Sequence, residues 1–97
     1  MPLVITQHPY PANPTIVCDW CHVPITTGED GNYQWRHVAE GETSPMSFTH
    51  KHCCYAFEQA NAGMWMAIEL SWLLPFLASN LKVDVKQTMA TIRAYNR

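Results

Sequence analysis

The chain has 97 residues, of which 47% are hydrophobic and 14% are charged. This length fits one small domain, and the composition excludes an intrinsically disordered chain. The charge is uneven: residues 1–79 carry two basic and seven acidic side chains, net −5, whereas residues 80–97 carry four basic and one acidic, net +3. An acidic body argues against a protein that binds nucleic acid with its whole surface, but it leaves a contact through the basic tail open.

Residues 1–15 are predicted to form an extended N-terminal arm, because proline fixes φ and biases its neighbours towards extended conformations. The prolines of this segment are Pro2, Pro9, Pro11 and Pro14. The segment lacks the basic start and long apolar run of a secretion signal, so we expect a cytoplasmic protein whose thiols stay reduced.

Two short motifs carry the side chains that bind metals. Cys18 and Cys21 form a C-x2-C pair, and after 28 further residues His50 and Cys53 form an H-x2-C pair. Four nitrogen and sulfur ligands in two such pairs suit tetrahedral zinc. We therefore predict a structural zinc site at Cys18, Cys21, His50 and Cys53. In a chain this short, metal binding coupled to folding would add substantially to stability.

The second ligand pair has close competitors. His52 and Cys54 lie beside it in the sequence, and a helical turn could also bring Cys54 to the side of His50. The H-x2-C pair is preferred because it repeats the spacing of the first pair. A redox dithiol would need a βαβ context, and a disulfide framework would need secretion, and the sequence indicates neither.

Two short strands are predicted between the ligand pairs. Residues 33–38 alternate, with Tyr33, Trp35 and His37 on one face, and residues 46–50 place Met46, Phe48 and His50 on one face. An antiparallel hairpin of these strands would return His50 to the first cysteine pair.

Residues 51–62 are predicted to form a helix with Cys53 in its first turn, where the helix dipole and a metal both favour thiolate. Gly63 is expected to end this helix. Its inward face is predicted to consist of Tyr55, Ala56, Phe57 and Ala60.

Two more helices are predicted towards the end of the chain. Residues 64–81 show apolar side chains nearly all round a helix, with Pro75 as a kink or a break into two helices. Such a helix must be buried on more than one side. Residues 84–96 begin with Asp84 and Gln87 in the spacing of a capping box, and they carry an apolar stripe. The stripe consists of Val85, Met89 and Ile92.

Residues 16–62 resemble a treble-clef zinc finger. The similarity lies in Cys18-Asp-Trp-Cys21-His-Val-Pro-Ile25, the acidic glycine turn, Tyr33, and Phe48-Thr-His50-Lys-His-Cys53. The resemblance implies an α+β fold of zinc knuckle, β-hairpin and helix, with the same four zinc ligands. Residues 63–97 would then be a C-terminal helical extension. Treble clefs serve many functions, so the resemblance is specific for a zinc fold and not for an activity.

The sequence favours a non-enzymatic role. A hydrolytic zinc needs an open ligand position or a nearby base, and His37 on the acidic hairpin lacks the basic surroundings of a nuclease site. We expect a protein–protein interaction or adaptor module that contacts a partner, or itself, through the apolar segment 64–81. The alternative is a nucleic-acid-binding transcriptional regulator that uses the finger and the basic tail. A membrane span is not expected, because Glu69, Pro75 and Asn80 interrupt the apolar segment.

Overall fold

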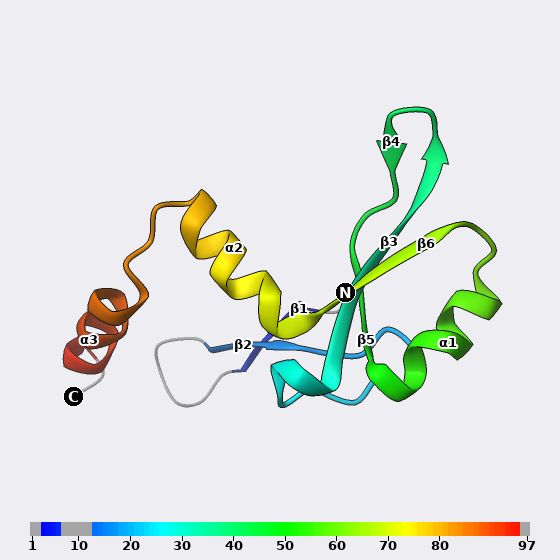
Figure 1. Ribbon diagram of the computed structural model, residues 1–97. Coiled ribbons are helices and arrows are strands. Elements are labelled where there is room, and N and C mark those ends of the chain that lie inside the picture. The colour runs from blue at the N-terminus through cyan, green and yellow to red at the C-terminus, as the bar shows by residue number, and fades with distance from the viewer. Residues whose placement is uncertain (1–2, 7–12, 96–97) are drawn as a thin grey trace.

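The computed structural model describes residues 3–6 and 13–95 and has a mixed α+β architecture (Figure 1). The chain opens with the strands β1 (Leu3–Thr6) and β2 (Asn13–Ile16), which pair antiparallel. Of the predicted N-terminal arm, residues 1–2 and 7–12 lie outside the described residues. Directly after β2 the chain enters the loop of the first cysteine pair, and the Ile25 N–H donates to the Ile16 carbonyl at 2.8 Å as the chain leaves it.

The longest strand, β3 (Gly31–Ala39), is the centre of the sheet and follows the short 3-10 helix η1 (Gly28–Asp30). The first half of β3 pairs antiparallel with β5 (Ser47–His50), with Tyr33 opposite Phe48. The end of β3 pairs with the two-residue strand β4 (Glu42–Thr43). The pairing of β3 with β5 confirms the predicted antiparallel hairpin.

The other edge of β3 is covered by β6 (Trp65–Glu69), and here the sequence prediction was wrong. The segment 64–81 is not one apolar helix: it consists of β6, the 3-10 helix η2 (Leu70–Trp72) and the helix α2 (Leu73–Asn80). The free edge of β3 offers β6 a full ladder of hydrogen bonds, and this tertiary pairing overrides the helical periodicity. Pro75 lies in the first turn of α2, where its missing N–H costs no hydrogen bond.

The helix α1 (Lys51–Ala60) follows β5 without a linker, as predicted. It covers the sheet face that carries Gln34, so this side chain is fully buried, whereas Tyr55 on α1 is 74% exposed. The inward face of α1 was therefore predicted incorrectly for Tyr55 and also for Ala60, which is exposed. Ala56 and Phe57 are half-buried, and Phe57 packs edge-to-face on Trp65 of β6.

The buried core is small and lies around the first and second ligand pairs. Its apolar members are Cys18, Ile25, Tyr33, Cys53 and Leu70. Two of these side chains are the cysteines of the predicted metal site, so the site and the core are one structure. Gln34, Thr49 and His50 add polar groups to the buried interior.

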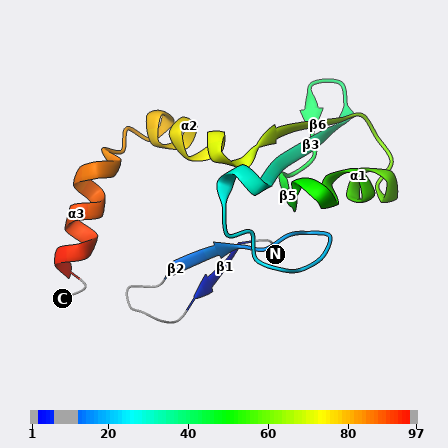
Figure 2. The same ribbon diagram turned by 60° about the horizontal axis from the view of Figure 1, so that its bottom comes forward.

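The C-terminal helices project from this body (Figures 1 and 2). The helix α3 (Val85–Tyr95) agrees with the helix predicted over 84–96, and the Gln87 N–H donates to the Asp84 carboxylate at 3.0 Å, as expected of an N-cap. The radius of gyration is 15.4 Å. A compact chain of this length would have about 12.5 Å, so the molecule is elongated. Within the described ranges, no helix is long and apolar enough to cross a membrane.

Candidate metal centre

The first cysteine pair lies in a tight turn in which backbone N–H groups are directed at the Sγ atom of Cys18. The N–H groups of Trp20 and Cys21 donate to the Sγ of Cys18 at 3.4 and 3.5 Å. The turn closes when the His22 N–H donates to the Cys18 carbonyl at 3.0 Å, and His22 takes a left-handed conformation with φ 63°. Residues 18–22, called the knuckle loop below, thus form the tight turn expected from the C-x2-C spacing.

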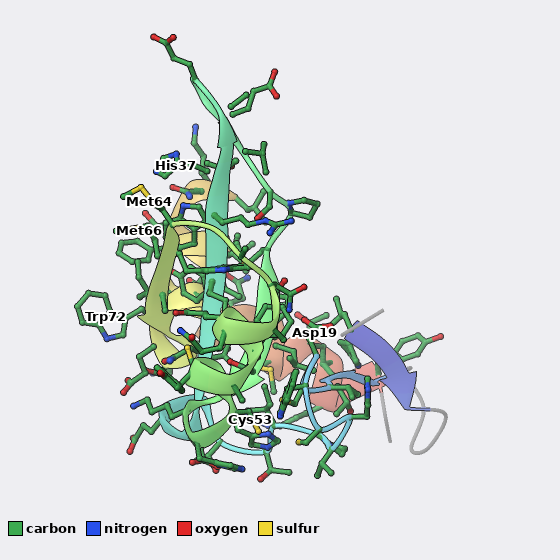
Figure 3. The ribbon with its side chains drawn as sticks, turned by 90° about the vertical axis from the view of Figure 1, so that its right-hand side faces the viewer. Asp19, His37, Cys53, Met64, Met66 and Trp72 are labelled. Carbon is green, nitrogen blue, oxygen red and sulfur yellow. The ribbon has the colours of Figure 1, made fainter. Side chains whose placement is uncertain are left out.

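The second ligand pair is placed by the junction of β5 and α1. His50 is the last residue of β5 and the N-cap of α1, and Cys53 lies in the first turn of α1. The backbone N–H of His50 donates to the Sγ of Cys18 at 3.4 Å. The sulfur of Cys18 therefore receives hydrogen bonds from both halves of the site. Figure 3 shows Cys53 beneath the first turn of α1, facing the knuckle loop.

The ring of His50 is oriented by a backbone acceptor. Its Nδ1 lies 3.4 Å from the Sγ of Cys21, and its Nε2 lies 3.3 Å from the carbonyl oxygen of Pro24. When Nε2 carries the proton it donates to Pro24, which leaves the Nδ1 lone pair directed at the thiols. Histidine ligands of metals are commonly held in one tautomer by such a bond to a carbonyl oxygen.

The ligand atoms of Cys18, Cys21, His50 and Cys53 all lie within 4.8 Å of one another. Tetrahedral zinc with ordinary Zn–S and Zn–N bond lengths would separate a sulfur and a nitrogen ligand by about 3.6 Å. The observed 3.4 Å between Cys21 Sγ and His50 Nδ1 is close to this spacing. The four predicted side chains are therefore positioned to bind a metal ion. Their donor set is consistent with zinc without identifying it.

The electrostatics of the three thiols require a cation if all are to be ionised. Burial alone would raise the pKa of Cys18, but the backbone N–H groups of Cys21, His50 and Trp20 outweigh it and lower this pKa to about 6. Burial, together with the neighbouring Cys18 and Cys21 sulfurs, raises the pKa of Cys53 to about 12. Without a metal, the cluster accommodates a thiolate at Cys18 and keeps Cys53 protonated. A divalent ion bound between the sulfurs would offset the burial and the repulsion that keep Cys53 protonated.

The two halves of the site are joined by Asp19. Its carboxylate accepts a hydrogen bond from the Phe48 N–H at 2.8 Å, and its own N–H donates to the Phe48 carbonyl at 2.7 Å. Phe48 lies on β5, two residues before His50. These bonds fix the knuckle against the strand that delivers the third ligand, on the side of the body opposite Trp72 (Figure 3).

His52 and Cys54 are outside the four-residue cluster. The ring of His52 stacks on that of His50 with centroids 5.1 Å apart. The thiol of Cys54 donates to the Glu58 carboxylate at 3.3 Å and accepts from the side-chain amide of Gln34 at 3.5 Å. Burial raises the pKa of Cys54, and the negative charge of Glu58 acts in the same direction. Cys54 is thus a protonated, half-buried thiol that faces the sheet.

Sequence reasoning missed the residues that support the ligands. The carbonyl of Pro24 gives no signal in the sequence, since any residue supplies one. Asp19 inside the C-x2-C loop could have been noticed, because aspartate commonly accepts backbone N–H bonds in turns. Gln34 alternates with the aromatic residues of the predicted strand and gave no sign of burial, yet it lies beneath α1 and accepts a hydrogen bond from the Thr49 hydroxyl at 2.7 Å.

Comparison with known proteins gives no match: no family model, no curated protein and no solved structure is significantly similar to this chain.

Proposed function

We propose that this chain is a small, non-enzymatic zinc-binding protein of treble-clef type that acts as a protein–protein interaction or adaptor module. The observation that carries the proposal is the cluster of Cys18, Cys21, His50 and Cys53 inside the buried core. The order of knuckle, β-hairpin and helix supports the treble-clef assignment. Four protein ligands fill a tetrahedral zinc, which leaves no position for a water to be activated.

The adaptor role is supported by the apolar surface. Trp72, Leu74 and Phe76 on η2 and α2 are 57%, 70% and 53% exposed. Aromatic and large aliphatic side chains are the usual anchors of protein interfaces, and soluble monomers rarely leave them in contiguous patches. In Figure 3, Met64 and Met66 project from the same side of the molecule as Trp72, so this surface extends from η2 along β6.

The alternative function is nucleic-acid binding through the C-terminal helix. The observation that favours it is that Lys82, Lys86 and Arg93 are exposed on or beside α3. The net charge of −5 on residues 1–79 opposes it, since a phosphate backbone would be repelled by the body. Binding to DNA or RNA that weakens steeply with salt would favour this alternative over the adaptor.

The zinc site is tested by native mass spectrometry of the protein expressed in metal-replete medium. We expect one zinc per chain. The chain offers matched controls on either side of the second pair: Cys53→Ser and His50→Ala should lose the zinc, whereas Cys54→Ser and His52→Ala should retain it. The site would be refuted if the controls Cys54→Ser and His52→Ala lost zinc as Cys53→Ser and His50→Ala do. A wild-type chain without metal would also refute it.

A further inference from the structure

An apolar groove of about 400 Å³ lies between the N-terminal hairpin and the start of α2. One wall is formed by Pro14 and Ile16 of β2, and the other by Leu70, Leu73 and Leu74. Leu74 is 70% exposed, so the rim of the groove is open to solvent. The groove is separate from the metal cluster, although Leu70 reaches the shared core.

The helix α3 has an apolar stripe that is left exposed by residues 3–6 and 13–95. Each residue from Leu81 to Tyr95 is exposed, including Val85, Met89 and Ile92, which lie on one side of α3. A helix of 11 residues is marginal in water without a tertiary contact. The stripe is flanked by Lys86 and Arg93, which lie two turns apart on one edge of the helix.

The corner between α2 and α3 holds the helix away from its own groove. The N–H groups of Lys82 and Val83 donate to the carbonyls of Ser79 and Ala78 at 3.2 and 2.8 Å, which is a Schellman motif, and Lys82 is left-handed with φ 56°. The Asp84 N-cap starts α3 immediately afterwards. Both views show α3 leaving the end of α2 at a steep angle, clear of the body (Figures 1 and 2).

The charges of α3 and of the body indicate which surface α3 can bind. If α3 packed against α3 of a second copy, Lys86 and Arg93 of one helix would lie near Lys86 and Arg93 of the other, and these like charges would repel. The body is acidic, and Glu29 and Asp30 of η1 follow Gly28, which lines the groove. A basic amphipathic helix therefore fits the groove of another copy of this chain better than it fits another α3.

We propose that two copies of this chain exchange their C-terminal helices, so that α3 of each copy docks in the groove between β2 and α2 of the other. This inference deepens the proposed interaction role, on which it rests, by naming the partner. Ten large apolar or aromatic side chains between Trp72 and Tyr95 are at least 38% exposed. Together they offer on the order of 1,000 Å² per chain, above the largest patch of a typical monomer, and Leu74, Val85, Met89 and Ile92 are the members that lie on the groove rim and the stripe.

The test uses full-length variants whose mass is measured by light scattering and native mass spectrometry. The wild type should have twice the chain mass of 11.1 kDa. The double variant Met89→Asp/Ile92→Asp places acidic groups in the stripe, and Leu74→Asp places one at the rim of the groove. Each variant alone should raise the dissociation constant of the dimer at least about 100-fold. The matched control Gln87→Glu/Ala94→Asp adds the same charge to the opposite side of α3 and should stay dimeric.

Mixing the two disruptive variants distinguishes exchange from other dimers. A heterodimer of the α3 variant and the groove variant contains one intact helix-in-groove contact, so mixing should restore a dimer that neither variant forms alone. A dimer that mixing does not restore would overturn the exchange. A wild-type chain that stays monomeric to about 0.1 mM, or whose α3 binds anionic vesicles or DNA as a monomer, would also overturn it.

The same mass spectra show how much metal is bound and how many chains are present, so the zinc site and the exchange of α3 are tested independently. A monomer with one zinc refutes the exchange and leaves the zinc site intact. A metal-free dimer with the expected variant behaviour supports the exchange and refutes the zinc site.

Discussion

Replacing Asp19 with alanine should weaken both the fold and the metal site. The substitution leaves the Phe48 N–H of β5 without the carboxylate that accepts its hydrogen bond at 2.8 Å, whereas the backbone bond from Asp19 to the Phe48 carbonyl is retained. A hydrogen bond to a charged group contributes about 1.5–3 kcal/mol, and solvent access to the half-buried Asp19 reduces this to about 1–2 kcal/mol. Because the bond aligns Cys18 and Cys21 with His50, most of this loss should also appear as weaker zinc binding, about 10-fold.

The assay is competition for zinc against a chromophoric chelator, together with urea unfolding of the zinc-loaded protein. Asp19→Asn keeps an oxygen acceptor without the charge, so its loss should be about half that of Asp19→Ala. Glu40→Ala removes a carboxylate from the exposed turn after β3 and is the control for net charge. If Asp19→Ala matched the Glu40→Ala control in both measurements, the proposed alignment of the two ligand pairs by Asp19 would be wrong.

Three further predictions concern the knuckle and the buried network. His22→Val should lower the free energy of unfolding by about 1–2 kcal/mol, because a β-branched residue resists the left-handed conformation, and His22→Gly should not lower it in the same urea titration. Gln34→Met keeps the volume but leaves the Thr49 hydroxyl without its acceptor, so calorimetry should show a loss of about 1–3 kcal/mol; a Thr49→Val/Gln34→Met protein should recover part of it. After chelation of the metal, ultraviolet thiolate absorbance should reveal one group with a pKa of about 6 that Cys18→Ser abolishes. Since the folded-state pKa of Cys18 is lowered, its contribution to stability is present above the ordinary thiol pKa and is lost as the pH falls through about 6. Thiols that all titrate together near their ordinary pKa would contradict this last prediction.

The sequence was sufficient for the metal cluster because its determinants are local. Two-residue gaps fix the geometry within each pair, and alternating aromatic residues predict the strands that return His50 to Cys18. The N-cap of α3 was also predictable, since Asp84 acts only on the residues that immediately follow it.

The errors arose where a distant partner decides the conformation. Residues 65–69 have the apolar spacing of a helix, but they pair with β3 because its second edge is open. Gly63 makes the turn into β6 at φ 148°, a backbone conformation that residues with a side chain rarely adopt, and it lies beside the side chain of Arg36 on β3. The burial of Gln34 likewise depends on α1, which is distant in sequence from β3. Such long-range competition is not encoded in the periodicity of either segment.

The pairing of β6 with β3 determines how short the chain can be made before it stops folding by itself. A chain cut after residue 62 would retain all four ligands, yet it would uncover the second edge of β3 and remove Leu70 from the core. An unpaired edge of this length is a template for other strands, so the shortened chain should aggregate even though it keeps the four side chains positioned to bind a metal ion. The unit that can be transplanted into another protein, or lost as one piece, therefore includes β6 and η2. The strand β6 completes the sheet and also leads directly from the core to the apolar surface of η2 and α2. A change that removes β6 would therefore alter the core and the apolar surface together.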